Sequence, residues 1–156
     1  MHPRFKATIE SLNPLFRALV EMPPLNKEPL PRDLPMQGIY LFSEGEEHLY
    51  VGRSNNVRNR YGQHCRLGSQ HNQAVFAFKI ARKETGNVKP VYKQGEGSRK
   101  ALAADPNFDE AFQKAKERVR AMDFRCIEVR DQKQQTLLEI YCAIALDSTY
   151  NDFDTH

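Results

Sequence analysis

The sequence predicts an α/β fold of the α+β type, in which a small three-stranded antiparallel sheet is flanked by helices. Two short β-prone runs, 37–43 and 48–52, are separated by four residues that include three glutamates and a glycine, which is typical of a hairpin. A third run, 124–130, alternates apolar and polar residues like a strand. Segments with the apolar spacing of helices precede, separate and follow these runs.

The composition sets the outer limits of this prediction. A chain of 156 residues with 40% hydrophobic content can build one domain around a single core. No apolar run approaches the ~20 residues that cross a bilayer, and the start lacks the apolar stretch of a secretion signal, so a cytoplasmic protein is expected. The three cysteines have no CxxC spacing, which favours reduced thiols over a disulfide framework or a zinc site.

Residues 1–36 are predicted to form a helical extension followed by a Pro-rich connector. The segment 5–21 has helical spacing, but Pro14 interrupts it. We therefore expect a helix that begins after Ser11 or Asn13, with Pro14 in its first turn and at most a separate short helix before it. Two prolines end this helix and 25–35 is an extended connector, so the region is interpreted as an accessory lid or dimer element.

Four further segments follow the hairpin. Residues 54–56 supply N-cap candidates for a helix over 57–67, and 73–80 suits either a strand or a buried helix, with the helix favoured. The stretch 85–97 combines glycines and lysines and is expected to be a mobile basic loop, after which Asp105-Pro106 opens a helix to about Met122. The last predicted helix, 132–146, is expected to turn these residues towards the core: Leu137, Leu138, Ile140, Tyr141, Ile144 and Ala145.

The charge is concentrated in the middle of the chain. Between residues 52 and 100 there are eleven Lys or Arg and two acids, a net charge of +9, whereas the flanks carry −6. Such a basic segment in an otherwise acidic chain suits a polyanion, because neutralised phosphates release counterions. The alternative is an ordinary solvated face.

Four side chains offer the groups that hydrolyse a phosphodiester. Arg60 and His64 are four residues apart on one helical face, where Arg60 can donate two hydrogen bonds to a phosphate and His64, with a reference pKa of ~6.5, can accept a proton from Tyr40 or from water. Tyr40 and Tyr50 stand on neighbouring strands, and a nearby cation and metal would lower the pKa of a phenol. Tyr40 is favoured as the base and Tyr50 as a positioning group. The alternatives are a surface ion pair, a structural histidine and core aromatics.

Glu139 and Asn151 complete the candidate site. A carboxylate flanked by Leu138 and Ile140 must face outward or bind something, and Mg²⁺ often uses a single carboxylate beside the substrate phosphate. The amide of Asn151 would steer a phosphate or the active-site backbone, unless it is an ordinary turn residue. Gly38 and Gly52 would permit a close approach of backbone or phosphate, although strand-end turns explain them almost as well.

Taken in order, these residues resemble the GIY-YIG endonucleases. The two triplets are Gly38-Ile39-Tyr40 and Tyr50-Val51-Gly52, with Val51 in place of isoleucine, and the resemblance spans about 37–151. It implies that Arg60 and His64 form the helix motif, that Glu139 binds the metal and that Tyr150-Asn151 closes the motif set. The chain departs from the compact family core by an insertion at about 66–122, within a predicted nuclease domain of 37–156.

The resemblance and the chemistry together predict a Mg²⁺-dependent (or Mn²⁺-dependent) DNA endonuclease. One centre cuts one strand, so cutting a duplex requires a homodimer or two nicks. A non-catalytic nucleic-acid-binding module and a ribonuclease are the alternatives, and repair, restriction and mobile-element roles all stay open. The residues expected to contact the nucleic-acid backbone are Arg53, Arg58, Lys89, Lys93, Arg99 and Lys100.

Overall fold

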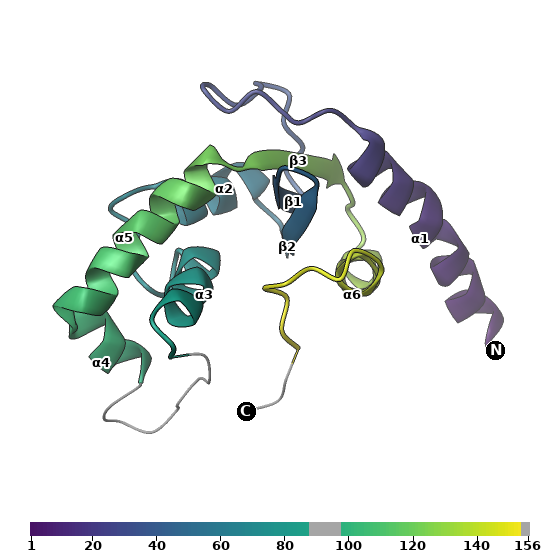
Figure 1. Ribbon diagram of the computed structural model, residues 1–156. Helices are drawn as coiled ribbons and strands as arrows, with labels where there is room; N and C mark the ends of the chain where they lie inside the picture. Colours follow the sequence, from purple (N-terminus) through teal and green to yellow (C-terminus); the bar gives the residue numbers. More distant parts are fainter. Residues whose placement is uncertain (88–97, 154–156) are drawn as a thin grey trace. The chain divides into compact units, whose positions relative to one another are not determined.

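The computed structural model describes residues 1–87 and 98–153, which form an α+β fold as the sequence predicts (Figure 1). The chain divides into two compact units, each of which is described by itself. The first comprises Met1–Arg60 and Met122–Asn151, and the second comprises Tyr61–Ala121 with the C-terminal residues. In chain order the elements are α1 (Pro3–Glu21), β1 (Gly38–Glu44), β2 (Glu47–Ser54), α2 (Val57–Cys65), α3 (Val75–Glu84), α4 (Arg99–Ala104), α5 (Pro106–Ala121), β3 (Asp123–Glu128) and α6 (Gln132–Ala145).

The sheet of the first unit is antiparallel, with β1 between β2 and β3. The predicted hairpin is confirmed, and Gly45 supplies the positive φ of 62° that its turn requires. Since side chains alternate along a strand, Ile39 and Leu41 of β1 face one side, where α1 and α6 cover the sheet (Figure 1). Tyr40 and Phe42 face the other side and pack with Phe124.

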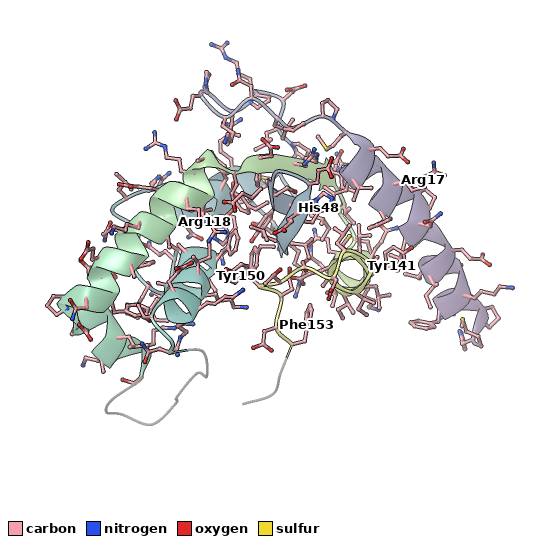
Figure 2. All side chains as sticks on the ribbon, viewed as in Figure 1. Arg17, His48, Arg118, Tyr141, Tyr150 and Phe153 are labelled. Atoms are coloured by element: carbon pink, nitrogen blue, oxygen red, sulfur yellow. The ribbon has the colours of Figure 1, made fainter. Side chains whose placement is uncertain are left out.

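Helix α1 differs from the prediction, because it is one continuous helix with Pro14 in its interior. Proline removes one helical hydrogen bond, but tertiary packing holds the helix on both sides of it. Ser11 accepts a hydrogen bond from Gln134 at 2.9 Å. The rings of Phe16 and Tyr141 meet edge to face with their centroids 5.1 Å apart, on the side of α6 that faces α1 (Figure 2). Helix α1 is thus part of the core of this unit, and a dimer surface on its outer side stays a prediction.

Helix α6 lies where the sequence predicts, but its buried stripe is narrower. Leu138 and Cys142 are buried, whereas Ile140 is partly exposed and Ile144 is 75% exposed; Ala145 is exposed as well. The expectation that Ile140, Ile144 and Ala145 face the core was wrong, since those three residues lie on the side of the helix away from the buried line.

The second unit is helical. The favoured helix over 73–80 and the helix after Asp105 are confirmed as α3 and α5, while α4, capped by the side chain of Ser98, was not predicted. Phe78 of α3 packs against Phe108 and Phe112 of α5. Most of the predicted basic loop, 88–97, lies outside the described residues.

All three cysteines are buried free thiols. None of the helices in the described part of the chain is long and apolar enough to span a membrane.

Candidate active site

Tyr40 and Tyr50 lie on the aromatic side of the sheet, on adjacent strands. In the register of the hairpin Tyr40 pairs with Gly52, so Tyr50 is its diagonal neighbour, and the ring centroids are 6.4 Å apart. Both phenols are buried, Tyr40 to 2% exposure. The two tyrosines of the sequence motif are therefore brought together, as the period of two along each strand requires.

Gly52 makes this arrangement possible. A Cβ added at Gly52 would lie 2.3 Å from both Cζ and Oη of Tyr40, so the absent side chain is the space in which the phenol lies. Gly38 serves a different contact, because a Cβ there would lie 1.8 Å from the carbonyl oxygen of Ile127 on β3. Each glycine therefore admits a neighbouring part of the protein rather than open space for a ligand.

Arg60 of α2 brings a cation to the two phenols. Burial raises the pKa of Tyr40, the electrostatic interaction with the neighbouring Tyr50 raises it further, and the charge and hydrogen bond of Arg60 act in the opposite direction. Burial likewise raises the pKa of Tyr50, again against the charge of Arg60. In the free protein both tyrosines are consequently neutral hydrogen-bonding phenols at neutral pH.

His64 lies one turn after Arg60 on α2 and is completely buried. Asn56 directly precedes α2, and its side chain accepts a hydrogen bond from the backbone N–H of Asn59 at 3.0 Å, as expected for an N-cap. Their spacing of four residues places Arg60 and His64 on one face of this helix.

Glu139 reaches the same cluster from α6. Its charge raises the pKa of Tyr40 and of Tyr50, which places the carboxylate within electrostatic range of both phenols. Its Oε2 lies 3.3 Å from Nε of Arg53, with side-chain exposures of 21% and 42% respectively. Glu139 therefore neither points freely into solvent nor packs among the leucines of α6. Its carboxylate is already paired with the guanidinium of Arg53.

The side chains around Glu139 determine whether a divalent cation fits there. No group of three or more His, Cys, Asp or Glu side chains gathers anywhere in residues 1–87 and 98–153. A site here would thus rest on Glu139 with water and substrate oxygens, which is a donor set that Mg²⁺ accepts. Arg53 would have to release the Glu139 carboxylate before a metal ion could bind it.

Asn151 holds the edge of the sheet. Its Oδ1 accepts from the N–H of Val51 at 2.8 Å and its Nδ2 donates to the Val51 carbonyl at 2.7 Å, while Ser148 donates to the same Oδ1 at 2.7 Å. The preceding Tyr150 donates its N–H to the carbonyl of Leu49 at 3.1 Å. Of the roles expected for Asn151, the structure shows the contact with backbone: Asn151 holds the stretch of β2 between Tyr50 and Gly52.

The predicted backbone contacts are spread over both units. Arg58 is exposed and donates to the carbonyl of Pro31. Arg99 and Lys100 are exposed on α4 of the second unit, and Lys89 and Lys93 lie outside the described residues. In the described part of the chain, Arg53 is the only member of this group that pairs with a residue of the tyrosine cluster, which comprises Tyr40, Tyr50, Arg60 and Glu139.

The sequence analysis did not predict two buried basic side chains, Lys116 and Arg82. Lys116 is 1% exposed and donates to the carbonyls of Leu67 and of Ser69, the latter at 2.9 Å, and burial lowers its pKa. Arg82 is buried on α3. The signal for Lys116 was its position four residues after Phe112, within the apolar stripe of α5.

Comparisons of the chain with models of protein families, with curated proteins and with solved structures gave no match. The resemblance to GIY-YIG endonucleases therefore rests on the residues alone and stays a prediction.

Proposed function

We propose that this protein is a GIY-YIG type endonuclease that hydrolyses phosphodiester bonds of DNA with the help of Mg²⁺ or Mn²⁺. The observation that supports the proposal is the gathering of Tyr40, Tyr50, Arg60 and Glu139 at one point of the first unit. These residues are up to 99 positions apart in the sequence, and they combine a cation, a carboxylate and two phenols, as phosphoryl chemistry needs.

In the proposed reaction, the guanidinium of Arg60 binds the oxygens of the scissile phosphate and stabilises the charge that develops on them. Glu139 would hold the divalent cation, which polarises the phosphate and activates water when bound. Tyr40 removes the proton of the attacking water with His64 as acceptor, and Tyr50 positions the water or the phosphate. Asn151 acts as a positioning residue through the backbone of β2.

The test is cleavage of supercoiled plasmid by the wild type and by Glu139→Gln, with Mg²⁺, with Mn²⁺ and with EDTA. Glu139→Gln should lower the cleavage rate by about 100-fold or more, equivalent to about 2.7 kcal/mol or more of transition-state stabilisation. Glu128→Gln is the matched control, because Glu128 is an exposed carboxylate of β3 paired with Arg130, and it should cut like the wild type.

Each other outcome assigns a different function. An intact plasmid that the wild type still retards in a gel would favour the non-catalytic binding module, and cleavage of a labelled RNA alone would favour the ribonuclease. Cleavage that is unaffected by EDTA and by Glu139→Gln would remove the metal and its ligand from the proposal. Circular dichroism of both variants establishes that they are folded.

A further inference from the structure

Arg53 joins Glu139, the proposed metal ligand, to the edge of the sheet. Nε of Arg53 lies 3.3 Å from Oε2 of Glu139, and both residues belong to the first unit. Arg53 lies near the end of β2, an edge strand, two positions after Val51. Because side chains alternate along a strand, Arg53 projects to the side on which Val51 joins the core with Leu138 of α6. The ion pair is therefore a product of the fold and not of adjacency in the sequence.

Guanidinium groups outnumber carboxylates around this pair. Arg60 and Glu139 both act on the pKa of Tyr40 and of Tyr50, Arg60 lowering it and Glu139 raising it, so the two charges approach the same phenols. With Arg53, two guanidinium groups accompany one carboxylate. A divalent cation that arrived alone would add to this positive charge, whereas a phosphate brings the negative charge that offsets it. A metal ion and a phosphate are therefore expected to favour each other's binding here.

Arg53 is the more accessible member of the ion pair. Its side chain is 42% exposed, against 21% for Glu139, so its guanidinium is open to a ligand at the surface. Ion pairs with this much exposure are weak, because water screens their attraction. A phosphate offers the guanidinium two oxygens that match its fork, so it competes well with the carboxylate. The sequence also predicts a contact of Arg53 with the nucleic-acid backbone, and both contacts are made if Arg53 exchanges one partner for the other.

We propose that Arg53 makes metal binding depend on substrate: in the free protein it holds the carboxylate of Glu139, and a backbone phosphate of the DNA draws its guanidinium away and leaves the carboxylate to the metal ion. This inference rests on the proposed function, whose metal ligand and substrate it uses. Glu139 has further interactions, so the exchange concerns this partner alone. Because coupling between two ligands is reciprocal, Mn²⁺ and DNA should raise each other's affinity by the same factor.

Mn²⁺ titrations followed by electron paramagnetic resonance, with and without a short DNA duplex, test the exchange without using cleavage. The parent protein carries Tyr40→Phe, which keeps the ring and removes the hydroxyl so that the duplex stays uncut, as a gel verifies. Without the duplex, Arg53→Gln in this parent should bind Mn²⁺ about fivefold or more tightly, because its guanidinium no longer competes for the carboxylate. With saturating duplex, the two proteins should agree within about twofold, since Arg53 has then already left the carboxylate in the parent.

Two variants of the same parent are controls. Arg130→Gln removes an exposed arginine of the same unit that pairs with Glu128, and it should bind Mn²⁺ like the parent in both conditions. Glu139→Gln measures the Mn²⁺ that the duplex and other groups take up, which is subtracted. With Mn²⁺ present, the logarithmic salt dependence of duplex binding should lose about 1 from its slope in Arg53→Gln, because one phosphate contact is gone.

Several results would overturn the inference. An equal gain in Mn²⁺ affinity with and without the duplex would show that Arg53 stays beside the carboxylate, and no gain without the duplex would show that it does not compete. An unchanged salt slope in Arg53→Gln would show that Arg53 reaches no phosphate. If the parent and Glu139→Gln take up the same amount of Mn²⁺ even with the duplex, Glu139 holds no metal ion and the exchange has no object.

The outcome is distinguishable from that of the proposed nuclease. If the effect of Arg53→Gln on Mn²⁺ binding is confined to the duplex-free protein while the wild type leaves plasmid uncut, the exchange stands and the nuclease fails. If plasmid is cut in a manner that needs Glu139, but Arg53→Gln changes Mn²⁺ binding equally in both conditions, the nuclease stands and the exchange fails.

Discussion

Replacing Gly52 by alanine tests the geometry of the tyrosine cluster directly. The new Cβ would lie 2.3 Å from Cζ and Oη of Tyr40, whereas ordinary van der Waals contact begins at 3.4 Å. The phenol must therefore withdraw by about 1.1 Å, the difference between these distances. It has little room to do so, because its ring packs against Phe42 at 5.9 Å and Phe124 at 6.0 Å between centroids.

Two effects of opposite sign set the expected stability of Gly52→Ala. Overpacking a core costs about 1–3 kcal/mol, while alanine in place of glycine restricts the unfolded chain and returns about 0.4–1 kcal/mol. We expect the free energy of unfolding to fall by about 1–2 kcal/mol. If the proposed function holds, a displacement of this size in Tyr40 should also slow cleavage by about 100-fold.

Urea unfolding followed by circular dichroism measures the stability, and a second background isolates the cause. In Tyr40→Leu the ring is gone, so Gly52→Ala should there be neutral or slightly stabilising. Gly68→Ala is the control for the glycine effect alone, because a Cβ at Gly68 meets nothing within 4 Å. Equal destabilisation by Gly52→Ala in both backgrounds would refute the argument that the Tyr40 ring fills this space.

Three further predictions follow from single contacts. Asn151→Ala should lower the free energy of unfolding by about 1–3 kcal/mol and speed hydrogen exchange of the Val51 amide, whose bond to Oδ1 it removes; an amide that stays protected would contradict the role of the side chain. Lys116→Met should cost about 2–4 kcal/mol in urea unfolding because the carbonyls of Leu67 and Ser69 lose their donor, while the exposed Lys114→Met should stay within about 0.5 kcal/mol. Arg53→Gln should tighten Mn²⁺ binding several-fold in calorimetry, since Arg53 competes for the Glu139 carboxylate; weaker binding would show that Arg53 does not compete.

The sequence predicted the elements that carry a strong period or a strong boundary signal. The hairpin has alternating strands around Gly45, and α5 opens at a proline after a capping aspartate, so both follow from local chemistry. The prediction for α1 was wrong for the opposite reason. The contacts that hold the helix on both sides of Pro14 come from α6, about 120 residues later in the sequence. The short α4 has too few residues to show a period at all.

The site residues were found from their types and order, but their partners were not. That Gly52 receives Tyr40 follows once the register of the hairpin is known, and register depends on a turn that sequence describes only coarsely. The ion pair of Glu139 with Arg53 and the hold of Asn151 on Val51 join segments 86 and 100 positions apart. No local pattern encodes such contacts, so the sequence suggested the chemistry of these side chains and the fold supplied their arrangement.

The surroundings of Tyr40 determine how it can act as a base. Burial is the largest influence on its pKa and Tyr50 adds to it, so the charge of Arg60 does not suffice to ionise the phenol before substrate binds. The proton of Tyr40 must then leave during the reaction, which requires an acceptor whose basicity is available near neutral pH, such as an imidazole. The roles proposed for Tyr40 and His64 therefore depend on each other. Replacing either should slow cleavage almost as much as replacing both, whereas independent roles would give multiplicative losses.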